Sequence, residues 1–515
     1  MIRKLLVLLM ICSVTLYGCA VNPVTGKRQL TIIPESYELN IGKEQYIPSR
    51  QMQGGDYEVD PSLTKYVNSV GQRLAAVSDR KLPYEFVVIN NSIPNAWALP
   101  GGKIAVNRGL LIELENEAQL AAVLGHEIVH AAARHGAQGM ERGMMLQGAV
   151  AVAGVAAGGS SYANLITRGS QMAAGLVNQK YGRDAERESD LYGMKYMSRA
   201  GYDPRAAIGL QEVFVRLSED RETDWLSGLF SSHPPSQERV EANRETAKSL
   251  PETGELGRER YQAKIAHLKK TREAYEAYDE GRKALSEGKT DEALAFAKKA
   301  NRIEPKEGQF DALAGDVYLS QQQYQKAITN YDEALKDNDK FFYFYVQRGL
   351  AKEKLGDKSG ARRDLEKSTD FLPTATALNA LGNLSLAQGN QKEAVNYFKE
   401  AGTSNSAPGR EAARSLVILD LPENPNGYLR TSGKLNQAKM VIVQVLNPTP
   451  VSVRNVNVRV RYPDSQGRAR EVVKEVRGTI APGKAALIDT RVGPIEDPQL
   501  LRHIQVGVSK ATVVQ

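Results

Sequence analysis

Two histidines and a glutamate stand at a spacing that suits metal-dependent hydrolysis. Residues 121–133 have the composition of a helix, and they contain His126-Glu127-Ile128-Val129-His130. Histidines four positions apart lie on one face of a helix, so both imidazoles can reach one ion. Glu127 can take a proton from a metal-bound water, as in metallopeptidases. Because this helix is largely apolar, two histidines and a glutamate within it need partners. We predict zinc as the cofactor, His126 and His130 as ligands and Glu127 as the catalytic base.

Zinc needs a third protein ligand, and an acidic stretch downstream offers one. Residues 183–190 read Arg-Asp-Ala-Glu-Arg-Glu-Ser-Asp, so Glu186 and Asp190 share one helix face. Glu186 can bind the zinc while Asp190 holds a ligand histidine by its other ring nitrogen. Spacing favours Glu186 over Glu188, and a solvated charge run is the alternative. His135 does not fit the metzincin position for a third histidine, so we expect a helix-end residue there.

Length and composition limit the classes of protein that could carry this site. The chain has 515 residues, enough for roughly three or four domains. With 25% charged and 42% hydrophobic residues it is typical of a folded protein, not of collagen or a multi-span membrane protein. Lys and Arg exceed Asp and Glu by 67 to 60, a mild excess that does not indicate nucleic-acid binding. With only Cys12 and Cys19, a disulfide scaffold is excluded.

Residues 1–18 have the pattern of a signal peptide. Arg3 and Lys4 precede an apolar run over residues 5–16, which is too short to span a bilayer. The run ends in Leu-Tyr-Gly-Cys, which resembles a bacterial lipobox with Cys19 as the lipidated residue. That resemblance implies a periplasmic protein anchored by lipid, and Ala20 in the next position implies the outer membrane. The alternative is an ordinary signal peptide that happens to contain a cysteine.

A repeat of 33 or 34 residues occupies residues 274–407. Ala293, Ala327, Ala361 and Ala394 recur at this interval, and each follows a glycine by twelve positions. This is the tetratricopeptide pattern, in which small residues let the two helices of a unit approach closely. We predict an α-solenoid of about four repeats within residues 256–420. Its groove would bind a peptide, and a purely structural stack is the alternative.

Short strands are expected on both sides of the helical regions. Residues 86–89 predict a short β-branched strand and residues 103–106 a second strand, and we expect the second to be the sheet edge along which a peptide lies. Alternating valines between turn residues predict a small β-sandwich over residues 436–515, whose role is not readable. Small residues over 144–159 predict a lid or a buried helix. The expected fold class is therefore multidomain and mainly α, with an α+β zincin-type peptidase domain over residues 19–255.

Together these motifs resemble the HtpX/BepA-like family of zinc metallopeptidases, gluzincins with HExxH and a downstream glutamate. The family's second motif, Ser-Arg-x-x-Glu-x-x-Ala-Asp, is similar to residues 182–190, where Gly182 and Ser189 depart from it. Residues 22–27 and 95–102 also resemble the family. The resemblance implies one zinc per chain and a His-Pro at His233 with an arginine downstream. His233 is a tentative catalytic residue near the zinc or the oxyanion, and a structural turn is the alternative.

Two functions from different classes fit these features. One is a zinc endopeptidase of the bacterial envelope that cuts misfolded or stalled envelope proteins, with repeats that bind clients or an assembly machine. The other is a chaperone-like assembly scaffold whose active site is largely closed. The complete set of HExxH and Glu186 favours the endopeptidase. The scaffold stays an alternative because the lid-like run over 144–180 could cover the active site.

Overall fold

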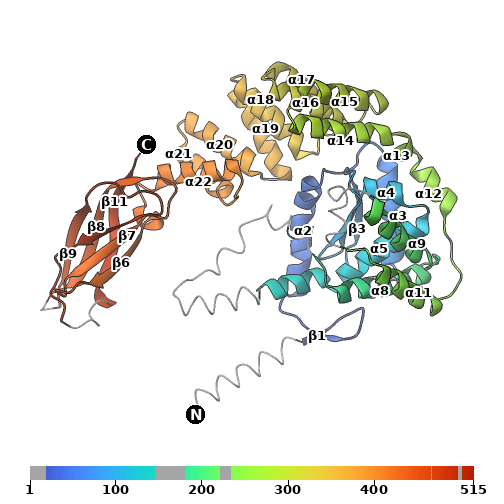
Figure 1. Ribbon diagram of the computed structural model, residues 1–515, viewed down its shortest axis with the longest axis horizontal. Coiled ribbons are helices and arrows are strands. Elements are labelled where there is room, and N and C mark those ends of the chain that lie inside the picture. Colours follow the sequence, from blue (N-terminus) through green and yellow to red (C-terminus); the bar gives the residue numbers. More distant parts are fainter. Residues whose placement is uncertain are drawn as a thin grey trace, which may run out of the picture. The chain divides into compact units, whose positions relative to one another are not determined.

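The computed structural model describes residues 19–144, 175, 180–220, 233–464, 467–496 and 502–514 (Figure 1). The expected signal peptide and nearly all of the small-residue run over 144–159 lie outside these ranges. The chain divides into two compact units, residues 1–357 with 370–372 and residues 358–369 with 373–515. Among the described residues, no helix combines the length and the apolar character needed to cross a bilayer.

A three-stranded sheet forms one side of the peptidase region. Its order is β3 (Glu85–Ile89), β5 (Lys103–Asn107) and β4 (Ala96–Leu99), with β3 parallel and β4 antiparallel to β5. Our expectation that residues 103–106 form the edge was wrong, because β5 pairs on both sides and all its residues are buried. Gly101 and Gly102, at φ +80° and +82°, turn the chain from β4 into β5. The edge on this side of the sheet is β4.

Helix α5 (Glu117–Ala132) packs against the sheet and carries the HExxH motif. It begins at Asn116, whose side chain accepts a hydrogen bond from the Gln119 amide, a standard helix N-cap. All its residues are buried. Glu117, in the first turn, accepts hydrogen bonds from the hydroxyls of Tyr66 and Tyr202 at 2.6 and 2.8 Å. The start of the helix is therefore fixed by polar contacts in an otherwise apolar core.

The remaining helices of this region surround α5. Helices α3, α8 and α9 pack directly on it, and α11 packs against α8 and α9 (Figure 1). Their bounds are α2 (Glu35–Met52), α3 (Pro61–Ala75), α4 (Arg108–Glu113), α8 (Arg183–Arg199), α9 (Ala206–Asp220), α11 (Gln237–Lys248), α12 (Arg258–Lys264) and α13 (Ala266–Lys270). A two-stranded ribbon of β1 (Cys19–Val21) and β2 (Arg28–Leu30) precedes them.

Helical hairpins of the repeat region follow in the same unit. They are α14 (Arg272–Ser286), α15 (Thr290–Ile303), α16 (Gly308–Ser320), α17 (Tyr324–Asp337) and α18 (Phe342–Lys354). The small residues act as predicted: Ala293 and Ala327 are fully buried, and a Cβ at Gly315 would lie 2.7 Å from the Tyr331 ring. Only glycine therefore lets α16 approach α17 this closely.

Buried polar contacts join the repeats to the peptidase region within this unit. The Arg108 guanidinium lies 3.4 Å from the ring centroid of Tyr275 on α14, and its Nε donates to Asn90 at 2.7 Å. Asn90 in turn donates to Glu307, which also accepts from Tyr275 at 3.0 Å. Because these groups are buried, the first repeats share one core with the peptidase region.

The second unit contains further repeat helices and a β-domain. The helices are α19 (Lys358–Phe371), α20 (Ala375–Ala387), α21 (Gln391–Ala401), α22 (Ala407–Asp420) and α23 (Pro425–Tyr428). The strands are β6 (Arg430–Leu435), β7 (Val441–Leu446), β8 (Val453–Pro463), β9 (Ala469–Val476), β10 (Ala485–Asp489) and β11 (Gln505–Val513). They form sheets β10-β7-β6 and β11-β8-β9, whose valines share one core. The predicted multidomain, mainly α fold class with a C-terminal β-sandwich is confirmed.

Candidate metal centre

The two motif-bearing helices meet at a pair of glycines. A Cβ at Gly193 of α8 would lie 3.1 Å from the backbone nitrogen of His126. A Cβ at Gly125 of α5 would lie 3.2 Å from the carbonyl oxygen of Gly193. Real Cβ atoms rarely sit so close, so the absence of side chains allows this approach. The consequence is that Glu186, two turns earlier on α8, reaches the histidines of α5.

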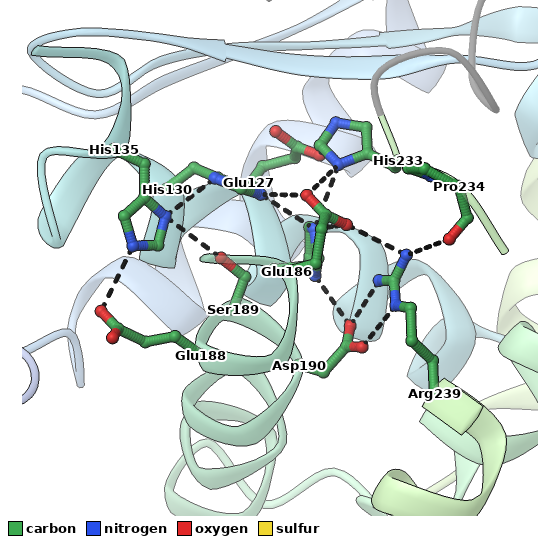
Figure 2. Close-up of polar contacts among 11 residues, drawn as sticks. Glu127, His130, His135, Glu186, Glu188, Ser189, Asp190, His233, Pro234 and Arg239 are labelled. Atoms are coloured by element: carbon green, nitrogen blue, oxygen red, sulfur yellow. Dashed lines mark hydrogen bonds and ion pairs between the residues drawn. The ribbon is translucent and has the colours of Figure 1, made fainter. Parts of the chain in front are cut away.

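Four side chains direct donor atoms at one point (Figure 2). The Nε2 atoms of His126 and His130 are 3.0 Å apart, and His233 Nδ1 lies 3.3 Å from His126 Nε2. Glu186 Oε1 is 3.0 Å from His233 Nδ1 and 3.3 Å from His130 Nε2. Glu186 Oε2 is 3.5 Å from His126 Nε2. All four residues are buried.

These separations fit a tetrahedral zinc site. Zinc binds imidazole nitrogen and carboxylate oxygen at about 2.1 Å, so neighbouring ligand atoms in a tetrahedron are about 3.4 Å apart. The observed separations of 3.0–3.5 Å bracket this value. The donor set is also of the kind that zinc prefers. His126, His130 and Glu186 would hold the ion, and His233 stands where a fourth ligand belongs.

A carboxylate and an arginine support His126 from behind. Asp190 Oδ1 lies 2.9 Å from His126 Nδ1, the contact expected from the spacing of Asp190 and Glu186. Asp190 also accepts two hydrogen bonds from Arg239, at 2.7 and 2.8 Å. Arg239 Nη1 lies 3.0 Å from Glu186 Oε2, without hydrogen-bond geometry, and donates to the carbonyl of Pro234. One guanidinium thus links α8 to the segment that carries His233, and Asp190 extends this link to His126 of α5.

A second support reaches His130 through a residue whose role the spacing did not reveal. We expected His135 to be a helix-end residue, and it does follow the end of α5, but it is buried and not at the surface. Its Nδ1 lies 2.9 Å from His130 Nδ1, and its Nε2 lies 3.2 Å from Glu188 Oε1. Arg134, at φ +65°, provides the left-handed turn that brings the imidazole back. Glu188, which spacing had turned away from the zinc, therefore orients a ligand indirectly.

Glu127 lies beside the donor set without belonging to it. It is 2% exposed, and its Oε2 has no hydrogen-bond partner among the described residues. Its Oε1 is 3.6 Å from His233 Nε2. A buried carboxylate oxygen without a partner is costly, so it points to a group that is bound during function. This is the position expected of a general base for a water molecule.

The electrostatics of the site favour a cation. Burial lowers the pKa of His126, but the carboxylates of Glu186 and Asp190 outweigh it and raise that pKa to about 10. Burial would raise the pKa of Glu186, but His233 and His126 hold it well below its ordinary value. For Glu127, burial raises the pKa, and His233 and His126 offset this only in part. Buried carboxylates in this number need positive charge between them.

Comparison with known proteins assigns the region that holds this site. The family model of Peptidase family M48 matches residues 61–247. The chain carries a peptidase family M48 domain. Two further descriptions, TPR repeat and Tetratricopeptide repeat, match residues 315–356 and 375–405. The predicted resemblance and enzyme class, a zinc metalloprotease with tetratricopeptide repeats, are thereby confirmed.

Similar proteins are found in other organisms. The beta-barrel assembly-enhancing protease of Escherichia coli (strain K12) is 28% identical over 431 residues, which cover 78% of this chain and 83% of that protein. A relative in Vibrio cholerae is 32% identical over 199 residues, or 37% of this chain and 40% of its own length. The mitochondrial metalloendopeptidase OMA1 of Arabidopsis thaliana is 34% identical over 158 residues, or 31% of this chain and 30% of that protein. All three relatives are named as proteases or metalloendopeptidases.

Proposed function

We propose that this protein is a zinc-dependent endopeptidase of the bacterial envelope that hydrolyses misfolded or stalled envelope proteins. The observation that carries the proposal is the buried set of His126, His130 and Glu186, spaced for one zinc ion, with the carboxylate of Glu127 beside it. A zinc ion in this site supplies Lewis acidity, which polarises a scissile carbonyl and acidifies water.

The remaining chemistry belongs to the chain's own groups. Glu127 Oε2 accepts a proton from the attacking water and delivers it to the leaving amine. Burial raises the pKa of Glu127 above its ordinary value, which makes the carboxylate a stronger base toward water. Asp190 and His135 fix the ring orientations of His126 and His130, so that each presents its Nε2 lone pair. Burial excludes bulk water from these charges.

The proposed location and clients rest on the relatives and on the sequence. A relative named for enhancing beta-barrel assembly covers most of this chain, which supports substrates or partners among β-barrel proteins of the envelope. Lipidation of Cys19 would anchor the enzyme to the membrane. Mass spectrometry of the mature N-terminus tests for this modification directly. The repeats, joined to the M48 domain through Arg108 and Glu307, would hold clients near the active site.

A second candidate function is an assembly scaffold whose peptidase site is largely closed. The observation that favours it is His233, whose Nδ1 lies 3.0 Å from Glu186 and 3.3 Å from His126. With His233 in that place, the donor set has four protein members, and the position that a catalytic zinc site keeps for water is filled. Substrate hydrolysis would then need displacement of this imidazole.

Cleavage of a denatured outer-membrane β-barrel protein, followed with and without a chelator, separates these functions. We expect chelator-sensitive cleavage by the unaltered chain and a loss of several orders of magnitude in Glu127→Gln with zinc content unchanged. His233→Ala should raise the rate if the imidazole closes the site. Wild-type turnover by Glu127→Gln would contradict the assignment of the base. If neither the unaltered chain nor His233→Ala cleaves the substrate, the scaffold function is supported instead.

A further inference from the structure

A wide groove beside the metal centre has a strongly cationic lining. It has a volume of about 960 Å³ and lies between the β1–β2 ribbon, the segment after α5 and the start of α8. We call it the cationic groove. Its basic side chains, all exposed, are Lys27, Arg28, Arg142, Lys180, Arg183 and Arg187. The two acidic residues in its lining are Asp184 and Glu188.

Most of this positive charge is not neutralised by the protein. Arg187 forms an ion pair with Glu238. Within the described ranges, the other five basic side chains of the cationic groove form no ion pair. Glu188 is engaged by His135 at 3.2 Å and by Asn22 at 3.5 Å, which leaves Asp184 as the one lining carboxylate that faces the five cations. The groove therefore presents a local excess of positive charge, although the whole chain carries only +7.

The cationic groove reaches the metal centre through two aromatic side chains. Tyr181 lines the groove and stacks on His130, with 3.9 Å between the ring centroids. His135 also lines it and has its ring centroid 4.9 Å from that of His130. A chain that occupies the groove thus comes within one side chain of a predicted zinc ligand.

An apolar cavity lies on the other side of the donor set. Its lining includes Ala122, Val123, Leu210 and Phe214 together with Glu127. On α5 the apolar cavity is lined from within residues 122–127, whereas the cationic groove is lined from within residues 135–142, beyond the end of the helix. Along α8 the order is reversed, with residues 189–197 on the cavity and residues 183–188 on the groove. The two recesses therefore flank the metal centre, and an extended peptide that crosses it enters both.

We propose that the cationic groove binds an acidic segment of the polypeptide substrate, a few residues from the scissile bond. An apolar side chain on the other side of that bond occupies the apolar cavity. This inference rests on the proposed endopeptidase function and names its substrate class. A polypeptide is favoured over an anionic lipid because the groove ends at Tyr181 and His135, whose rings contact the predicted zinc ligand His130, where a lipid headgroup has no chemistry to undergo. Several exposed ion pairs together amount to about a tenfold preference, which salt weakens.

Binding to the inactive Glu127→Gln chain tests the inference without relying on cleavage. The probes are two fluorescent peptides that differ only in a block of three glutamates or three glutamines next to an apolar residue. We expect the acidic peptide to bind about tenfold more tightly at low salt, and the advantage to shrink as ionic strength rises. Replacing Arg28, Arg142 and Arg183 by glutamate should abolish it.

A matched variant controls for net charge. Replacing Lys248, Lys289 and Lys336 by glutamate changes the net charge equally at exposed sites away from the groove, and should preserve the preference. Equal affinity for both peptides, or a preference that survives reversal of the three groove arginines, would overturn the inference. So would charge-dependent binding of phosphatidylglycerol vesicles that the groove reversal abolishes while peptide binding is unchanged. If the active chain cleaves neither peptide nor denatured protein, the proposed endopeptidase function fails, whatever the binding preference of the groove.

Discussion

The support of His130 by His135 makes a quantitative prediction about metal affinity. For His130 to present its Nε2 lone pair to zinc, its Nδ1 must carry the proton and donate it. The acceptor is His135 Nδ1 at 2.9 Å, and His135 Nε2 donates onward to Glu188 at 3.2 Å. His135→Phe keeps the ring and removes both nitrogens. It leaves the Nδ1–H of His130, a residue 1% exposed, without a partner.

The size of the effect follows from burial. Loss of an outer partner of a zinc-bound histidine costs about 10- to 100-fold in metal affinity, which is about 1.4–2.7 kcal/mol. Because His130 is almost inaccessible to water, we expect the upper half of that range. Glu188→Gln retains an acceptor for His135 and should cost less than Glu188→Leu. This order distinguishes orientation of the ring from simple packing.

Competition with a chromophoric chelator measures the zinc dissociation constant, and the visible spectrum of the cobalt form reports the coordination geometry. His503→Phe, in the C-terminal β-domain, is the matched control and should change neither. Thermal unfolding of the metal-free variants separates lost affinity from lost folding. Unchanged zinc affinity in a folded His135→Phe variant would refute the argument.

Three further predictions follow from packing and burial. Gly193→Ala adds a Cβ 3.1 Å from the backbone nitrogen of His126, so the zinc affinity and the unfolding temperature should fall. Gly182→Ala is the control: its Cβ has no atom within 4 Å, so neither quantity should change. Burial raises the pKa of Asp311 to about 6. The protonated carboxyl therefore favours the folded state at acid pH, and this contribution to stability is lost as the pH rises from about 4 to 6. Asp311→Asn should raise the unfolding temperature at about pH 7.5 but not at about pH 4. Arg108→Met removes the guanidinium that donates to Asn90 and packs on the Tyr275 ring, which leaves the buried Asn90 Oδ1 without its donor, so urea unfolding should show a loss of about 1–3 kcal/mol. An unchanged free energy of unfolding would contradict the coupling of repeats and peptidase region.

Local periodicity accounts for what the sequence predicted well. The spacing of His126 and His130 and that of Glu186 and Asp190 are properties of single helices, so the faces they occupy follow from 3.6 residues per turn. The phased alanines, Ala293 among them, predict close helix pairs for the same reason. Each of these inferences needs no knowledge of the tertiary arrangement.

What the sequence could not predict depends on contacts across the fold. His135 approaches His130 only because Arg134 adopts a left-handed conformation, which no residue pattern announces. The sheet order could not be derived, since residues 103–106 and β4 are both mainly apolar and only pairing decides which is central. The pairing of Gly125 with Gly193 is also invisible in the sequence, although glycine inside a helix was a usable signal.

The central claim is that His126, His130 and Glu186 converge on one zinc ion. Anomalous diffraction at the zinc absorption edge, from crystals of the purified chain, tests it most directly. We expect one peak in the M48 domain, about 2.1 Å from each histidine Nε2 and from the Glu186 carboxylate. A zinc-loaded crystal with its peak elsewhere, or with Glu186 turned away from both histidines, would contradict it.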